Sequence, residues 1–229
     1  MLVVTAHPDD VDFGASGTVA LLCAAGAAVT YCIATDGAAG GFDRAVGRSE
    51  MAEIRRREQC AAAAVVGADD VVFLGRSDGA LVVDLELRAA IARQIRRLEP
   101  ELVITQSPEI NYERMPASHP DHRAAGEAAL DAVYPDARNP FAFPELLAEG
   151  LEPHSVGEVW LMGHPAPDRA IDISGVIEKK LAAIAAHESQ LPDPARVREF
   201  VLEWTAAEAE RFGLGGGRHA EAFKVVRLA

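Results

Sequence analysis

Short apolar segments alternate with longer, helix-like segments along the first half of the chain. Each apolar segment contains few polar residues, which is typical of strands that are covered on both faces. Four such strands are expected, at residues 2–6, 29–35, 71–75 and 102–105. Strands that are separated by helices are joined by crossover connections. The pattern therefore predicts an α/β fold with a mainly parallel sheet and helices on both faces.

Helices are expected between these strands from their capping and stop residues. The expected ranges are 16–25, 49–66 and 85–98. Gly26 and Gly67 follow the first two, and glycine commonly ends a helix. Asp84 is a candidate N-cap for the third helix, whose apolar residues recur at helical spacing, and Pro100 stops it.

The pattern becomes less regular after residue 134. The proline-rich segment 134–153 is expected to run over the surface. The elements expected beyond it are strands at 158–163, 169–174 and 221–228 and helices at 174–186 and 194–212. The last of these helices should turn its apolar side chains inward, namely Val197, Phe200, Val201 and Trp204. We expect these segments to complete the same single domain.

The charge balance argues against several classes of partner. The 229 residues carry a net charge of -13, whereas nucleic acids and anionic membranes are bound by basic surfaces. No apolar segment is long enough to span a bilayer, and no basic-then-apolar signal sequence is expected at the N-terminus. Cys23, Cys32 and Cys60 include no C-x-x-C pair, so small core residues in a reducing cytoplasm are expected.

Polar residues follow each of the four predicted strands. The four stretches read "HPDD", "TDG", "GRSDG" and "QSPEINY". Because the carboxyl ends of parallel strands lie at one edge of a sheet, these loops should share one rim. Ligands of such sheets bind beyond this edge, so the rim is the expected site.

The first of these loops gathers an unusual amount of negative charge. His7, Asp9, Asp10 and Asp12 lie within six positions, and neighbouring carboxylates raise one another's pKa. His7 and Asp10 could bind one metal ion, whereas the alternative is a turn capped by an aspartate. The motif by itself leaves both interpretations open. A calcium loop is excluded because Phe13 stands where a ligand is needed.

A second histidine motif, "SHPDHR", lies more than a hundred residues later. Ser118 and Asp121 fit a capping box, so Asp121 could serve only to cap a helix that starts near His119. A cap does not explain why His119 and His122 both lie in that first turn. The positive end of a helix favours neutral imidazole, which is the metal-binding form.

A serine nucleophile is a competing interpretation. The residues around Ser77 match G-x-S-x-G, the nucleophile-elbow pattern, and follow a predicted strand. An elbow needs a helix directly after the serine, but the next predicted helix begins near Leu85. A polar loop is therefore favoured. No dinucleotide or nucleoside-triphosphate motif is present, and His154 and His164 are expected at surface or packing positions.

The two histidine motifs together resemble a known family. "AHPDD" after the first strand, followed by "HPDH" about half-way along, is similar to the LmbE-like or PIG-L N-acetylglucosaminyl deacetylases, which include those of mycothiol and bacillithiol biosynthesis. "TDGAAG", "RSDG", "AAHESQ" and "HAEAF" resemble further family segments. The helix "RRREQCAAAAVVGA" also fits, with Gln59 where leucine is usual. The resemblance covers most of the chain but does not extend to residues 134–153, and it implies one Rossmann-like domain over residues 1–229.

The resemblance implies a zinc-dependent hydrolase that removes the acetyl group from an N-acetylated amino sugar. In this chain it implies zinc ligands at His7, Asp10 and His122, catalytic roles for Asp9, His119 and Asp121, and substrate contacts from Arg55, Asp78 and His219. Asp9 would be the general base. His119 would be the general acid or a cation beside the oxyanion, and Asp121 would orient it. Two histidines and one carboxylate are typical of catalytic zinc.

Several questions stay open at this level. An amidase acting on thiol conjugates, an antibiotic-tailoring deacetylase, a Ser77 hydrolase and a non-catalytic metal- or sugar-binding module are alternatives. A small amino-sugar substrate is the expected partner, and the oligomeric state is open, a homo-oligomer included. Substrate specificity is expected to depend on residues 134–153. Asp12 has no assigned role and is expected to be a solvated loop carboxylate.

Overall fold

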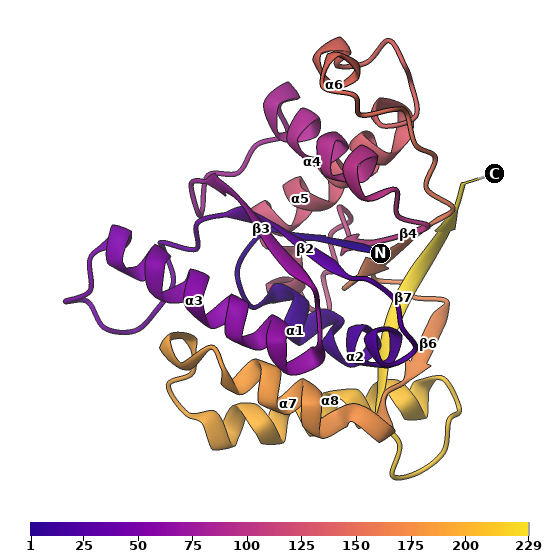
Figure 1. Ribbon diagram of the computed structural model, residues 1–229. Coiled ribbons are helices and arrows are strands. Elements are labelled where there is room, and N and C mark those ends of the chain that lie inside the picture. The colour runs from indigo at the N-terminus through magenta and orange to yellow at the C-terminus, as the bar shows by residue number, and fades with distance from the viewer. Residues whose placement is uncertain (229) are drawn as a thin grey trace.

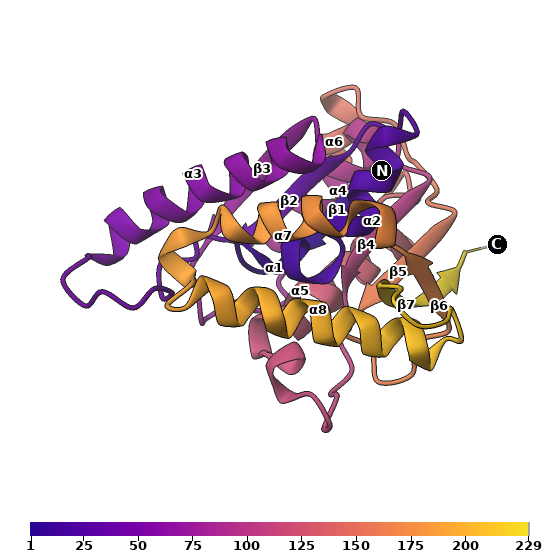
Figure 2. The ribbon, with the colours of Figure 1, turned by 90° about the horizontal axis from the view of Figure 1, so that it is seen from below.

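A seven-stranded sheet runs through the middle of the molecule, with helices on both of its faces (Figures 1 and 2). The computed structural model describes residues 1–228. The strands are β1 (Leu2–Thr5), β2 (Thr30–Thr35), β3 (Asp70–Arg76), β4 (Leu102–Gln106), β5 (Glu158–Met162), β6 (Arg169–Asp172) and β7 (Ala220–Arg227). Each matches a strand that the apolar pattern predicts, to within one or two residues.

The strand order is β3-β2-β1-β4-β5-β7-β6. Strands β1 to β5 pair in parallel, and β7 pairs antiparallel with both β5 and β6. The predicted α/β fold with a mainly parallel sheet is therefore confirmed. The order reverses between β1 and β4, and ligands of such sheets bind at this switch point.

Eight α-helices of the described chain cover the sheet. They are α1 (Asp10–Gly14), α2 (Ser16–Ala24), α3 (Arg48–Val66), α4 (Leu85–Leu98), α5 (Pro120–Asp131), α6 (Pro144–Ala148), α7 (Ile177–Ala185) and α8 (Pro194–Arg211). The predicted N-cap of α4 is confirmed, because the Asp84 side chain accepts a hydrogen bond from the Leu87 amide. Within residues 1–228, no helix has both the length and the apolar character needed to cross a membrane.

The core lies in two layers, one on each face of the sheet. Leu2 and Val4 of β1 pack with α4 and α5, while Val3 packs on the opposite face with α2 and α3. Alternate residues of one strand thus enter different layers, and this is why the strands are apolar throughout. Helices α7 and α8 lie on the same side of the sheet as α3 (Figures 1 and 2).

Helix α8 buries a narrower stripe than its apolar residues predict. Val201, Thr205 and Ala209 are buried at successive turns, whereas the Phe200 side chain is 51% exposed. Phe200 precedes Val201 by one residue and therefore points about 100° away around the helix. The prediction that Phe200 faces inward is wrong, because only one side of α8 is covered.

The cysteines differ in their environments. Cys32 is buried in β2, Cys23 is partly buried, and Cys60 is exposed on α3, all as free thiols. The prediction of small core residues holds for Cys32 and is wrong for Cys60, which lies on the solvent side of its helix.

The segment 134–153 is attached to α4. Arg96 is buried and donates hydrogen bonds to backbone carbonyls of this segment, while Arg88 pairs with Asp136 at 2.9 Å. Leu146 of α6 is fully buried in the core layer of α4 and α5. These anchors lie on α4 and not on the loops after β1 to β4. The role of this segment in substrate specificity stays a prediction.

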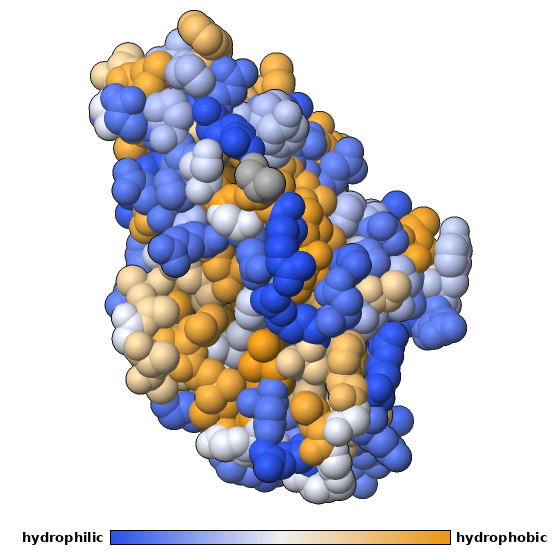
Figure 3. All heavy atoms as spheres, turned by 90° about the vertical axis from the view of Figure 1, so that its right-hand side faces the viewer, coloured by the Kyte–Doolittle hydropathy of each residue, from blue (hydrophilic) through white to orange (hydrophobic). Residues whose placement is uncertain are grey.

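Charged pairs lie along the β6 and β7 edge of the sheet. Lys224 pairs with Asp168 at 2.7 Å, and Arg169 pairs with Glu158 at 2.9 Å. Hydrophilic and hydrophobic residues are interspersed on this side of the molecule (Figure 3). Charged side chains at an edge strand oppose pairing with another chain.

Candidate metal centre and active site

The loops after β1, β3 and β4 meet beside the point where the strand order reverses. His7 follows β1, Asp78 follows β3, and His122 lies in the first turn of α5, the helix that follows β4. The His7 ring centroid lies 5.0 Å from that of His119 and 5.1 Å from that of His122. The two sequence motifs, far apart in the chain, therefore lie side by side at one rim, as predicted.

Helix α5 reaches the rim because it packs directly on the backbone after β4. A Cβ atom added at Gly126 would collide with the Gln106 carbonyl oxygen. Only glycine allows the helix to come this close. The close approach fixes the height of the first turn of α5 above the sheet, and with it the position of His122.

The start of α5 is capped differently from the prediction. Nδ1 of His119, and not the Ser118 hydroxyl, accepts the hydrogen bond from the Asp121 amide at 3.2 Å. Ser118 Oγ instead accepts from the Asn111 amide at 2.8 Å. The predicted capping box is wrong, because the tight turn before Pro120 brings the imidazole over the helix end.

The carboxylate of Asp121 has other partners. It accepts hydrogen bonds from the backbone amides of Gly79 at 2.7 Å and Leu81 at 3.2 Å, in the loop after β3. Its Oδ2 also lies 3.2 Å from Nε2 of His7. The side chain therefore ties the start of α5 to the β3 loop and to His7, while its contact with His119 is through the backbone amide.

Ligand atoms of three residues lie close together at the rim, with Asp10 turning a different oxygen toward each histidine. Nδ1 of His7 lies 3.2 Å from Nε2 of His122, which lies 3.0 Å from Oδ1 of Asp10. Nδ1 of His7 lies 3.4 Å from Oδ2 of Asp10. Tetrahedral ligands at about 2.0–2.1 Å from zinc lie roughly 3.3 Å from one another. This donor set therefore fits a divalent cation.

The turn at "HPDD" is compatible with both interpretations that the sequence leaves open, a turn capped by an aspartate and a metal site. Oδ2 of Asp10 accepts a hydrogen bond from the His7 amide at 2.6 Å, which closes the turn after β1. The other oxygen, Oδ1, faces His122. The carboxylate thus caps the turn and still has an oxygen available for a metal ion.

The second nitrogen of His7 is held by two carboxylates. Nε2 lies 3.2 Å from Asp78 Oδ1 and 3.2 Å from Asp121 Oδ2. An acceptor at Nε2 keeps the proton of neutral imidazole there and leaves the Nδ1 lone pair for a metal, an arrangement typical of metal-binding histidines.

Two other groups of potential ligand atoms share His7. One adds His119 and His122, and the other adds Asp78 and Asp121. In the first, His119 Nδ1 already accepts a backbone hydrogen bond, and in the second both Asp121 oxygens do so. The group with Asp10 is favoured, because its imidazole nitrogens face each other without a competing backbone donor.

The pKa shifts at the rim reflect an excess of carboxylates. Burial opposes protonation of His7, but Asp10 and Asp78 outweigh it and raise the His7 pKa to about 11. Burial likewise opposes protonation of His122, whose pKa Asp10 nevertheless raises. Burial opposes ionisation of Asp10, but His122 and His7 hold its pKa well below the usual range. A divalent cation would neutralise the same excess of charge.

Asp9 points away from these ligand atoms. Its Oδ2 lies 3.0 Å from the Arg55 guanidinium, whereas the next residue, Asp10, faces His122. Burial raises the pKa of Asp9 to about 6, although Arg55 acts in the opposite direction. A carboxylate with a pKa near neutrality suits proton transfer.

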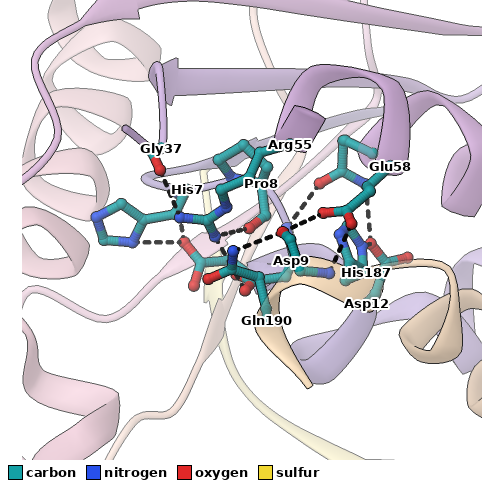
Figure 4. A network of polar contacts seen from close by, with 12 residues as sticks. His7, Pro8, Asp9, Asp12, Gly37, Arg55, Glu58, His187 and Gln190 are labelled. Atoms are coloured by element: carbon teal, nitrogen blue, oxygen red, sulfur yellow. Dashed lines mark hydrogen bonds and ion pairs between the residues drawn. The ribbon is translucent and has the colours of Figure 1, made fainter. Parts of the chain in front are cut away.

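Arg55 is engaged by protein groups. It is buried and donates to the Gly37 carbonyl at 3.0 Å, to the Pro8 carbonyl and to Asp9. Figure 4 shows these contacts between His7 on one side and Asp12 and His187 on the other. Asp78 Oδ2 lies 3.7 Å from the guanidinium and accepts from the Ala39 amide at 2.9 Å. Arg55 and Asp78, two of the three predicted substrate contacts, therefore lie next to Asp9 and His7.

His219 lies away from this group of residues. Its Nδ1 is 2.8 Å from the Thr205 hydroxyl of α8, and its backbone amide donates to the Ser174 hydroxyl. The remaining histidines have packing partners, as expected: His154 contacts the Pro100 carbonyl and His164 lies 3.4 Å from Glu109. The substrate role predicted for His219 gains no support from this placement.

Ser77 does not occupy a nucleophile elbow. The residue is exposed, and α4 begins only at Leu85. The loop instead directs Asp78 toward His7 at 3.2 Å.

Asp12 and His187 form a buried pair that the sequence interpretation missed. The expectation that Asp12 is a solvated loop carboxylate is wrong, because its side chain is fully buried. Its Oδ2 accepts from Gln59 Nε2 at 2.8 Å and contacts His187 Nε2 at 2.8 Å. The available signal was His187 itself, because a histidine in an apolar stretch needs a polar partner.

Comparisons with known proteins agree with this site. A family model described as PIG-L, GlcNAc-PI de-N-acetylase, matches residues 2–133. Diacetylchitobiose deacetylase from Thermococcus kodakarensis is 34% identical over 99% of this chain and 82% of that protein. A probable N-acetyl-alpha-D-glucosaminyl L-malate deacetylase 2 from Bacillus cereus is 34% identical over 83% of each chain.

The fold has a close counterpart among solved structures. N,N'-diacetylchitobiose deacetylase from Pyrococcus horikoshii, solved with an inhibitor, has a TM-score of 0.90 and 31% identity, over 99% of this chain and 83% of that chain. The relatives also include a protein named for another reaction, 4-oxalmesaconate hydratase from Pseudomonas putida, 30% identical over 82% of this chain and 73% of that protein. The family match spans more than half of the chain, so the predicted family and the predicted enzyme class are confirmed: the chain belongs to the PIG-L family of deacetylases.

Proposed function

We propose that this protein is a zinc-dependent hydrolase that removes the acetyl group from an N-acetylated amino sugar and releases acetate and a free amine. The observation that carries the proposal is the convergence of His7, Asp10 and His122 donor atoms at 3.0–3.4 Å beside Asp9. The relatives named for diacetylchitobiose and for an N-acetylglucosaminyl malate support the substrate class.

His7, Asp10 and His122 would hold the ion. When bound, zinc would supply Lewis-acid chemistry, because it polarises an amide carbonyl and makes water more acidic. The carboxylates of Asp78 and Asp121 would keep His7 oriented through its other nitrogen.

Asp9 would act as the general base. Water attacks the acetamide carbon and passes a proton to the Asp9 carboxylate, whose pKa of about 6 favours the ionised form at neutral pH. The carbon–nitrogen bond then breaks, and the amine leaves with the proton that Asp9 took from the water.

His119 would donate a hydrogen bond to the developing oxyanion. Reduced contact with solvent, with His7 and His122 nearby, lowers the pKa of His119. Its Nδ1 accepts the Asp121 amide, so a neutral ring carries its proton on Nε2. An N–H donor aimed at an oxyanion is commonly worth ~3–4 kcal/mol.

A hydratase is the second candidate, favoured by the relative of that name. Hydration of a carbon–carbon double bond would use the same metal ligands and a base at Asp9. It would release no acetate, so the two candidates differ in their products.

The test measures acetate release from a panel of N-acetylated amino sugars, including N-acetylglucosamine and N,N'-diacetylchitobiose. We expect activity in the zinc-loaded protein, loss on chelation, recovery on addition of zinc, and strong loss in Asp9→Asn. Full activity after chelation or in Asp9→Asn would contradict the proposed mechanism. Absence of acetate from every substrate, together with hydration of 4-oxalmesaconate, would favour the hydratase.

A further inference from the structure

The backbone of Asp9 has a conformation that its residue type disfavours. Its φ is 101° and its ψ is -29°, in the left-handed region, where a side chain meets steric strain. Such a conformation persists only where the surrounding structure holds it, and it is common at functional sites. The turn allows α1 to begin at Asp10, so that the two adjacent carboxylates point in different directions.

Gln59 of α3 binds the backbone of this turn through its side chain. Its Oε1 accepts the hydrogen bond from the Asp9 amide at 2.9 Å, and its side chain is fully buried. Because Oε1 is the acceptor, Nε2 must be the donor, and it points at Asp12 Oδ2 at 2.8 Å. The orientation of the Gln59 amide is thus determined at both ends.

Asp12 and His187 fix that orientation. An ionised carboxylate offers only acceptors, so Asp12 excludes the flipped Gln59 amide. His187, which follows α7, contacts the same Oδ2 at 2.8 Å, and both residues are fully buried. The other oxygen, Asp12 Oδ1, has no hydrogen-bond partner within residues 1–228. The network therefore needs one acceptor oxygen from Asp12 (Figure 4).

We propose that Gln59, oriented by Asp12 and His187, is a positioning residue that keeps Asp9 in its left-handed conformation. Gln59 thereby holds the Asp9 carboxylate beside Arg55 and apart from the metal ligands. The inference rests on the proposed function, because it concerns the residue assigned there as the base.

The effect of a substitution follows from the hydrogen bonds. Gln59→Leu removes the acceptor of a partly buried amide and leaves Asp9 without the contact that offsets its strain. We expect residue 9 to relax to an ordinary φ, which moves its carboxylate. The expected loss in kcat is about 10- to 100-fold, with KM and bound zinc close to wild type, because no metal ligand is altered.

Asp12 offers a conservative variant that separates geometry from charge. Asn at position 12 retains one acceptor oxygen for both Gln59 and His187, and its amide group takes the place of the unpartnered Oδ1. Asp12→Asn should therefore retain kcat within about threefold, whereas Asp12→Ala should lose activity as Gln59→Leu does. Gln94→Leu is the matched control, because Gln94 is a buried glutamine of α4 that contacts Arg97.

The experiment compares these four variants with wild type in the zinc-loaded full chain. It measures kcat, KM, zinc content, the thermal midpoint and the φ of residue 9 in crystal structures. The inference is supported if Gln59→Leu keeps zinc and KM, loses kcat and leaves the left-handed region, while Asp12→Asn and Gln94→Leu retain activity. It is overturned if Gln59→Leu keeps the wild-type kcat or the wild-type φ at residue 9, or if Gln59→Leu loses its zinc. It is also overturned if the kcat of Asp12→Asn is as low as that of Asp12→Ala.

The crystal structures keep this test independent of the proposed function. If wild type releases no acetate, the proposed function fails, and the φ of residue 9 in Gln59→Leu still decides whether Gln59 holds the turn. If wild type is active and that φ is unchanged, the proposed function stands and the positioning role is excluded.

Discussion

Oδ2 of Asp121 lies 3.2 Å from Nε2 of His7. The side chain predicted to orient His119 thus contacts the other end of a ring whose Nδ1 faces His122 and Asp10. Because partners of this kind hold metal-binding imidazoles in one tautomer, we expect Asp121 to support the proposed metal site. This contact leads to the first prediction.

Asp121→Asn should weaken zinc binding by about 10- to 100-fold, because the amide no longer fixes the proton on His7 Nε2. The measurement is competition for zinc against a chromophoric chelator. Glu127→Gln, an exposed change on the same helix, is the control and should bind zinc as wild type does. Unchanged affinity with a lower kcat would instead support the predicted role on His119.

His122→Ala and His119→Ala should have different consequences. His122→Ala removes one of three converging donors, so the protein should lose most of its zinc. His119→Ala should keep its zinc and lose about 10²- to 10⁴-fold in rate, the usual contribution of a proton-transfer or hydrogen-bonding group. Metal analysis beside acetate release separates the two, and equal zinc contents would show that the ligand assignment is wrong.

Gly126→Ala should destabilise the fold and disturb the metal site together. The added Cβ collides with the Gln106 carbonyl oxygen, so α5 must move away from β4 and carry His122 with it. Overpacking of this kind commonly costs about 1–3 kcal/mol. Urea unfolding and zinc titration provide the measurements. Gly175→Ala, where an added Cβ meets no atom, should leave both quantities unchanged.

Glu221→Gln should be among the most destabilising changes outside the site. Glu221 and Lys180 form a fully buried pair at 2.7 Å, and Glu221 also accepts from the Gly17 and Thr18 amides. Removing one charge of a buried pair leaves the other uncompensated, at a cost of about 3–5 kcal/mol.

The control for this prediction is the exposed pair of Arg198 and Glu178. Removing it with Arg198→Ala should leave the free energy of unfolding close to that of wild type, because solvent screens an exposed ion pair. Denaturant unfolding of both variants tests the contrast, which disappears if the buried pair contributes no more than the exposed one.

The sequence by itself determined the architecture and the edge of the sheet at which the site lies. Apolar strands and capped helices are local patterns, so the parallel sheet and most element boundaries could be read directly from them. Because the loops after parallel strands lie at one edge, the residues after β1 and β4 had to approach each other. The assignment of His7 and His122 to one metal site came from the resemblance of the two motifs to the family.

Only the tertiary structure decided how these side chains are used. Asp12 is separated from Gln59 by 47 residues and from His187 by 175, and only the packing of α1, α3 and the turn after α7 brings them together. The same packing buries Asp12, turns Arg55 toward Asp9, and directs Asp121 to His7. Such contacts depend on the relative placement of distant elements, about which local periodicity carries no information.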